Sequence, residues 1–110
     1  MTRALLLDLD DTLVVEEPAA VAAFAATASY AAERHPVDPR QLALDARAGA
    51  RELWHAAEVC DFGRRIGISS WEALWCRYEG DDDELRAMRE WAPGFRRGAW
   101  RGALERQGVE

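Results

Sequence analysis

Hydrophobic residues follow one pattern near the N-terminus and another along the rest of the chain. Ala4–Leu7 is an unbroken apolar run that leads into a cluster of acidic residues. A run this short and uniformly apolar is typical of a strand buried on both faces, as in parallel sheets. From about residue 18 onward, apolar residues recur at helical spacing instead. The pattern predicts one buried strand followed by four or five amphipathic helices.

Capping residues, prolines and glycines mark the ends of the predicted helices. Asp38 before Pro39 is a typical helix start, and Ser69 with Glu72 has the spacing of a capping box. Pro93-Gly94 is expected to separate the last two helices. We expect helices over residues 18–34, 39–57, 69–78, 81–92 and 95–107, with a loop over residues 59–68. The apolar stripes predict a core of Val21, Phe24, Ala28, Leu42, Ala46, Ala50, Leu53, Trp54, Leu74, Trp75, Tyr78, Leu85, Met88, Trp91, Phe95, Ala99, Trp100 and Leu104.

The acidic cluster after the predicted strand is the strongest candidate for catalysis. In open α/β sheets, ligands bind beyond the carboxyl ends of the strands, which is where Asp8 and Asp10 are expected to lie. Together with a divalent cation, two such carboxylates can hold an anionic substrate. One carboxylate then attacks a phosphoryl group while the other serves as the acid and base. A turn or capping role is the alternative for these acids, but it leaves the preceding apolar strand unexplained.

The segment Asp8-Leu9-Asp10-Asp11-Thr12 resembles the first motif of the haloacid dehalogenase superfamily, D-x-D-x-T after a hydrophobic strand. The resemblance implies that Asp8 is the nucleophile and a magnesium ligand. It implies that Asp10 is the general acid and base and also a metal ligand, and that Thr12 supports the loop. Asp10 favours a phosphatase over a dehalogenase. The implied function is Mg²⁺-dependent hydrolysis of a small phosphorylated metabolite through an aspartyl-phosphate intermediate.

The resemblance also implies a domain organisation. The expected fold class is α/β, with a Rossmann-type core represented by its first strand and followed by a mostly helical cap. Residues 1–15 would form the first core strand and the motif loop, and residues 16–110 the cap region. The family's later motifs are not recognisable, and the sequence contains no lysine for the usual phosphoryl contact. The chain is therefore expected to be an N-terminal portion that is inactive alone, unless a homo-oligomer or a complementing chain completes it.

Two interpretations outside this catalytic scheme stay open. The chain can instead be a non-catalytic helical interaction module that retains the motif. In the loop over residues 59–68, Arg64 and Arg65 lie between two glycines and form either a solvated turn or an anion clamp that contacts the substrate.

Composition narrows the partners and the compartment. The net charge of -6 argues against a nucleic acid as partner. No apolar run has transmembrane length and no signal peptide is recognisable, so we expect no membrane association. Cys60 and Cys76 are expected to stay reduced in a cytoplasmic protein.

Overall fold

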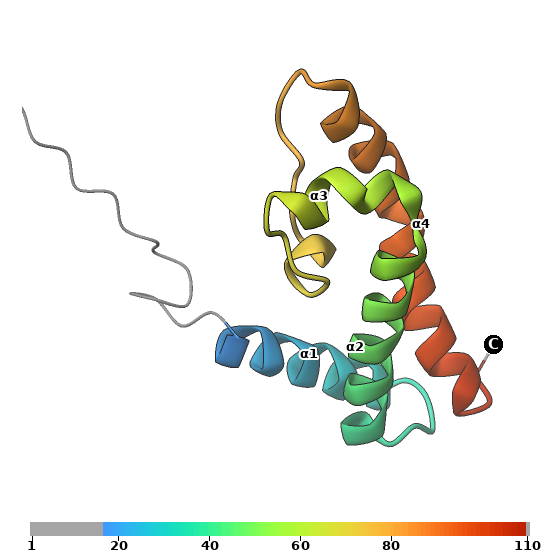
Figure 1. Cartoon of the computed structure of the whole chain (residues 1–110). Coiled ribbons are helices and arrows are strands. Elements are labelled where there is room, and N and C mark those ends of the chain that lie inside the picture. The colour runs from blue at the N-terminus through green and yellow to red at the C-terminus, as the bar shows by residue number, and fades with distance from the viewer. Residues whose placement is uncertain (1–16, 110) are drawn as a thin grey trace, which may run out of the picture.

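The computed structural model describes residues 17–109, which form helices joined by short connections (Figure 1). The long helices are α1, α2 and α4, and the shorter α3 lies between α2 and α4 in the sequence. Their bounds are Glu17–Ala32 for α1, Pro39–Ala56 for α2, Asp61–Arg65 for α3 and Asp83–Arg106 for α4. Two single turns of 3-10 helix, η1 (Glu58–Cys60) and η2 (Glu72–Leu74), complete the described part of the chain.

The predicted α/β class is wrong, because residues 17–109 are helical and contain no strand. A sheet requires at least two strands whose backbone N–H and C=O groups pair with one another. The described residues provide no such partner, since their apolar positions recur at helical spacing. The predicted strand Ala4–Leu7 lies outside the described residues, as does the whole of the predicted motif domain, residues 1–15.

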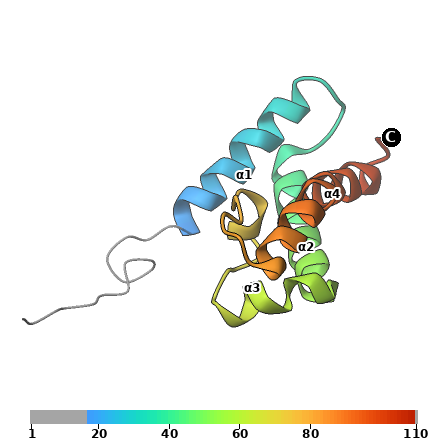
Figure 2. The same ribbon diagram turned by 90° about the horizontal axis from the view of Figure 1, so that it is seen from above.

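The centre of the molecule is the antiparallel pair formed by α2 and α4, which lie side by side in Figures 1 and 2. Alanines at the contact allow a close approach, and the oxygen of Ala99 would lie 3.6 Å from a Cβ placed on Gly49. At one end of the pair, the Asp38 N–H donates to Gln107 Oε1 at 2.7 Å, and Gln107 Nε2 donates to the Asp38 carbonyl at 3.1 Å. These two hydrogen bonds tie the start of α2 to the end of α4.

The predicted start of α2 is confirmed. Asp38 has an extended backbone, and its Oδ1 accepts a hydrogen bond from the Arg40 N–H at 3.0 Å, while Pro39 occupies the first turn. This is the arrangement that satisfies one of the N–H groups left free at a helix N-terminus. One predicted stripe of α2 is buried at Leu42, Ala46, Ala50 and Trp54, whereas Leu53 is 39% exposed.

Two apolar clusters flank the α2 and α4 pair. In the larger one, the Trp91 and Phe95 rings stack at 4.5 Å between centroids, and Trp54 lies 6.0 Å from Trp91. The smaller cluster includes Phe24 and Leu42, with the Phe24 ring 5.8 Å from Trp100. Both clusters exclude water from aromatic surface, which is the main stabilising contribution in a helical domain of this size.

The predicted break at Pro93-Gly94 is wrong, because α4 continues through both residues. Proline removes one N–H from the helical ladder and crowds the preceding turn. Pro93 and Gly94 lie on the exposed face of α4, where water can satisfy the carbonyl that loses its partner. On the opposite face, Ala92 and Phe95 are buried, and this packing holds the helix together across the proline.

The predicted helix over residues 69–78 is also wrong, because only the single turn η2 forms there. The backbone leaves the helical path after η2, and carbonyls at the end of η2 and beyond it accept hydrogen bonds from arginines of α4. Arg96 donates to the carbonyls of Leu74 at 2.5 Å and Cys76 at 2.7 Å, and Arg89 donates to those of Tyr78 and Gly80. The predicted loop over residues 59–68 is shorter than expected, since η1 and α3 occupy most of it.

The first helix differs from α2 and α4 in its surface. It is apolar on nearly every face, yet only Ala20, Phe24 and Ala28 are buried. Val21, which was predicted to be in the core, is 48% exposed, and Trp75, which lines a cavity of about 370 Å³ beside α1, is 50% exposed. Within residues 17–109, no helix has both the length and the hydropathy needed to cross a bilayer.

Candidate functional site

The predicted catalytic residues Asp8, Asp10 and Thr12 lie outside the described residues. The described chain begins shortly after them, with Glu17 in the first turn of α1. The Glu17 carboxylate pairs with the Arg47 guanidinium of α2. This ion pair connects the segment that follows the motif to the middle of α2.

The largest cleft among the described residues opens beside the same arginine. It has a volume of about 790 Å³ and lies between one face of α2 and the segment that joins α3 to η2. Its lining is Leu44, Arg47, Ala48, Arg51, Glu52, Trp54, His55, Arg64, Gly67, Ile68, Ser69, Ser70 and Trp71. We call this site the α2 cleft.

The α2 wall of the cleft is basic. Arg47, Arg51 and His55 are spaced four residues apart, so helical geometry places them along one face. Arg47 is paired with Glu17, whereas no carboxylate of residues 17–109 lies within ion-pairing distance of Arg51 or His55. The acid that lines the cleft, Glu52, lies 3.9 Å from the Arg106 guanidinium.

The opposite wall is fixed by the predicted capping box, which is confirmed. The Ser69 N–H and Oγ both donate to Glu72 Oε2, at 2.7 and 2.9 Å, and the Glu72 N–H lies 3.3 Å from Ser69 Oγ. These hydrogen bonds hold Ser70 and Trp71, which lie between the two residues, against the cleft. Within residues 17–109, the Ser70 hydroxyl makes no hydrogen bond to protein, so it can donate one to a ligand.

The two candidate anion-clamp arginines both lie near the Asp61 carboxylate, Arg64 at 3.9 Å, but they differ in their position relative to the cleft. Arg64 lines the cleft, and its Nη1 donates to the carbonyls of Trp54 at 2.6 Å and Ala57 at 3.1 Å, at the end of α2. Arg65 is exposed, does not line the cleft, and lies 3.2 Å from the Asp61 carboxylate. A direct contact of either arginine with a substrate stays a prediction.

Perturbed titratable groups lie in the larger apolar cluster and not in the cleft. Burial raises the pKa of the Cys60 thiol to about 11, against a smaller opposing effect of the nearby Arg64 charge. Burial likewise raises the pKa of Tyr78 well above its ordinary value, and its hydroxyl donates to the Ala73 carbonyl at 2.8 Å. Both groups are therefore neutral near pH 7. In the described part of the chain, no group of three His, Cys, Asp or Glu side chains is arranged to hold a metal ion.

Sequence reasoning missed Arg51 and Ser70 as members of a binding site. The four-residue spacing of Arg47, Arg51 and His55 was a detectable signal, because it places three basic side chains on one helix face. No pattern in the sequence indicated that Ser70 lies opposite Arg51. The position of Ser70 depends on how the chain returns to α2 after α3.

The sequence is similar to that of a curated protein. No protein-family model matches the sequence, and no solved structure matches it. A phosphoserine phosphatase from Thermus thermophilus is 37% identical over 106 residues, which are 96% of this chain and 39% of the phosphatase. Only four of the 110 residues fall outside the match, so it includes Asp8–Thr12 wherever it begins.

This similarity relates the chain to a phosphatase. The chain spans about two fifths of the length of that curated relative.

Proposed function

We propose that the chain provides the catalytic aspartates and the helical cap region of a haloacid dehalogenase superfamily phosphatase that acts on a small phosphomonoester. The observation that carries this proposal is the 37% identity to the phosphoserine phosphatase across a stretch that includes Asp8–Thr12. In this scheme residues 16–110 form the cap, which covers the substrate. The ion pair of Glu17 with Arg47 supports it, because it holds α2 close to the segment that follows the motif.

The proposed reaction has two steps. A carboxylate oxygen of Asp8 attacks phosphorus, the bond from phosphorus to the leaving oxygen breaks, and the Asp10 carboxyl gives its proton to that oxygen. Water then attacks the aspartyl phosphate, and the Asp10 carboxylate takes a proton from it. Phosphate leaves and Asp8 returns to its starting form.

The donor set of the motif fits Mg²⁺. Magnesium prefers hard oxygen ligands and is commonly held by one or two carboxylates together with substrate phosphate oxygens. Asp8 and the backbone carbonyl of Asp10 would provide such oxygens. When bound, Mg²⁺ would offset the negative charge of the phosphoryl group and the nucleophile.

The test is the magnesium-dependent hydrolysis of O-phosphoserine and an aryl phosphate by the product of the complete gene. We expect Asp8→Asn to abolish turnover and the incorporation of labelled phosphate. Asp11→Asn is the matched control, because Asp11 stands at the second variable position of D-x-D-x-T and its loss should leave turnover nearly unchanged. Full activity in Asp8→Asn, or equal losses in both variants, would remove Asp8 as the nucleophile.

The 110-residue chain alone is expected to turn over phosphate esters near the background rate. Asp8 and Asp10 provide two metal contacts, and the motif contains no cation for the phosphoryl oxygens. Loss of a single electrostatic donor commonly lowers the rate by about a hundredfold or more. Robust magnesium-dependent hydrolysis by this chain that disappears in Asp8→Asn would show that it assembles a complete site.

A helical interaction module is the second candidate function. The exposed apolar surface of α1, including Val21 and Tyr30, favours it, since such surface commonly marks an interaction site. The same gene product decides between the two functions. A module predicts no turnover that depends on Asp8, together with a folded helical domain.

A further inference from the structure

We propose that the α2 cleft binds a small organic dianion, such as a phosphate ester or a dicarboxylate. This inference does not rest on the proposed function, because binding in the cleft requires neither Asp8 nor a metal ion. It rests on the charges, hydroxyl groups and shape of a site built entirely from described residues.

The cleft contains one arginine, Arg51, without an acidic partner among residues 17–109, whereas its other two arginines are paired, Arg47 with Glu17 and Arg64 with Asp61 at 3.9 Å. The chain carries a net charge of -6, yet three arginines and a histidine line this cleft, with Glu52 as the single acid among them. Arg51 and His55 have no acidic partner within residues 17–109, and Glu52 is near Arg106. An arginine guanidinium without a carboxylate partner is a strong donor to phosphate or carboxylate oxygens.

The end of α2 would ordinarily disfavour an anion, because helix C-termini carry a partial negative charge. Arg64 removes this obstacle. Its guanidinium donates to the carbonyls of Trp54 and Ala57 and lines the cleft beside His55. The carbonyls of Trp54 and Ala57 at this end of α2 are therefore already bonded, and the Arg64 guanidinium of α3 lies beside them.

The second wall provides a neutral donor and an aromatic surface. The Ser70 hydroxyl has no protein partner among the described residues, and Trp71 packs next to it along the same wall. An anion held by Arg51 can accept a hydrogen bond from Ser70 while the carbon skeleton of the ligand lies against Trp71.

The shape and overall charge define the ligand class. A volume of about 790 Å³ lies within the range typical of small-molecule sites. The net charge of -6 opposes a long polyanion, whose phosphates would extend beyond the cleft over the acidic surface. A ligand with two negative groups on a short carbon skeleton fits this volume and does not extend beyond the cleft.

The experiment is calorimetric titration of the 110-residue chain with 2-phosphoglycolate and with malonate at low ionic strength. EDTA excludes metal-dependent chemistry, so a failure of the proposed phosphatase function cannot change the result. We expect saturable binding of at least one dianion, weaker binding of glycolate and none of glycerol. Binding should weaken as salt is added, because exposed charges are screened.

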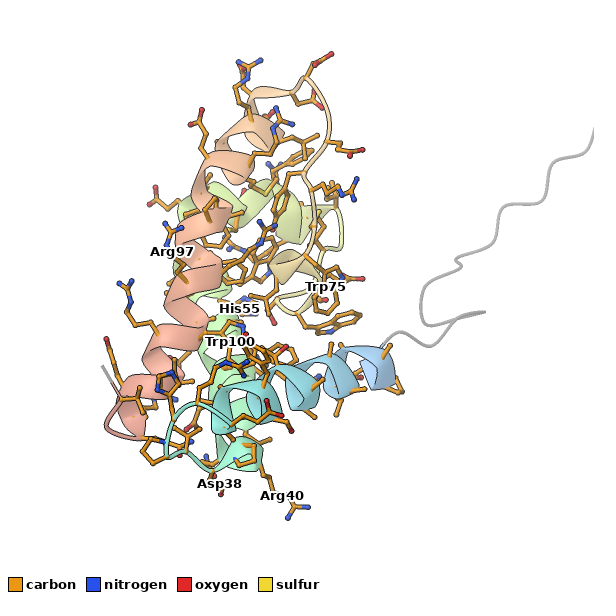
Figure 3. The ribbon with its side chains drawn as sticks, turned by 180° about the vertical axis from the view of Figure 1, so that it is seen from behind. Asp38, Arg40, His55, Trp75, Arg97 and Trp100 are labelled. Carbon is orange, nitrogen blue, oxygen red and sulfur yellow. The ribbon has the colours of Figure 1, made fainter. Side chains whose placement is uncertain are left out.

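Two arginine variants locate the site. Arg51→Gln should weaken dianion binding by about tenfold, since it removes a charge-assisted hydrogen bond. Arg97→Gln is the matched control, because Arg97 is an exposed arginine of α4 that does not line the cleft and points away from it in Figure 3. Ser70→Ala should weaken binding less than Arg51→Gln, and circular dichroism confirms that each variant is folded.

Three outcomes would overturn the proposal. The first is that the folded wild type binds neither dianion saturably. The second is that Arg51→Gln leaves the affinity unchanged. The third is that Arg51→Gln and Arg97→Gln lower the affinity equally. The last result would mean that the affinity for the dianion depends on the net charge of the protein and not on the residues of the cleft.

Discussion

The helices α1 and α2 are similar in length, with 16 and 18 residues, but they use their apolar residues in opposite ways. On α2 the apolar residues form one stripe that is buried against α4, and the other faces are polar. On α1 apolar residues cover nearly every face, yet a single stripe is buried. The difference shows that the hydrophobicity of a helix face does not by itself determine whether that face is buried. A helix buries the face for which the fold provides a partner.

The same contrast separates the tryptophans. Trp54 on α2 is 1% exposed and packs near Trp91 and Phe95, whereas Trp75, beside α1, is 50% exposed. Figure 3 shows Trp75 on the α1 side of the segment that precedes α4. Stability should therefore depend strongly on the α2 and α4 region and weakly on the surface around α1.

The largest effect should come from Trp54→Ala. Removal of a buried aromatic side chain leaves a cavity between α2 and α4 and commonly costs about 3–5 kcal/mol. The matched variant Trp75→Ala removes the same side chain from a half-exposed position and should cost about 2 kcal/mol, because only half of its surface is buried. Urea denaturation followed by circular dichroism measures both. Similar losses in the two variants would contradict the ranking of the two regions.

High pH should weaken the α2 and α4 region through Cys60, which is fully buried in its cluster. Because burial raises the pKa of this thiol from 9.0 to about 11, the folded state keeps the proton that the unfolded state loses. The contribution of the thiol is fully present below pH 9 and is lost as the pH rises toward 11, by about 2 kcal/mol.

Urea unfolding at about pH 8 and about pH 11 measures this loss. Cys60→Ala provides the control, because its difference from wild type should shrink at the higher pH. Burial is the main cause of the raised pKa of Tyr78, but the Cys60 charge also contributes to it, so both proteins carry Tyr78→Phe and no tyrosine titrates at this position. A difference that is constant across the two pH values would show that Cys60 is not protonated more strongly in the folded state.

A pair of glycine variants measures packing around Trp54 more finely. A Cβ on Gly63 would lie 2.7 Å from Trp54 Cη2 and 3.0 Å from Met88 Sδ, so Gly63→Ala should cost about 1–3 kcal/mol. Gly94 lies on the exposed face of α4 with no atom within 4 Å of such a Cβ. Gly94→Ala should instead stabilise the helix by about 0.5–1 kcal/mol. Thermal denaturation gives both values, and a stabilising Gly63→Ala would show that α3 can move away from Trp54.

Features determined by residues close in sequence were predicted correctly. The Asp38 cap and the Ser69 to Glu72 capping box each depend on atoms within three residues of one another. The buried stripe of α2 was predicted because helical spacing alone separates its two faces. Features determined by distant residues were not predicted. The non-helical path after η2 is one such feature, since its carbonyls and that of Leu74 accept hydrogen bonds from Arg89 and Arg96, which follow later in the chain on α4.

The candidate sites follow the same division. The Asp8–Thr12 motif is recognisable because its residues are adjacent, but its geometry lies outside the described residues. The α2 cleft joins Arg51 to Ser70 across the turn that α3 introduces, so only the spacing on α2 was visible in the sequence. Similarly, Arg64 and Arg65 are neighbours in the chain, yet one lines the cleft and the other does not.

The smallest effect should come from the outer face of α1, at Val21. This side chain is 48% exposed, so Val21→Ala removes little buried surface. Alanine also has a higher helix propensity than β-branched valine, by about 0.5 kcal/mol. We therefore expect Val21→Ala to leave stability unchanged or to raise it by at most about 0.5 kcal/mol, whereas Phe24→Ala on the buried stripe should cost about 3 kcal/mol. Denaturation is measured at two protein concentrations. If Val21→Ala lowers stability, and does so more at the higher concentration, then association of the protein buries the outer face of α1.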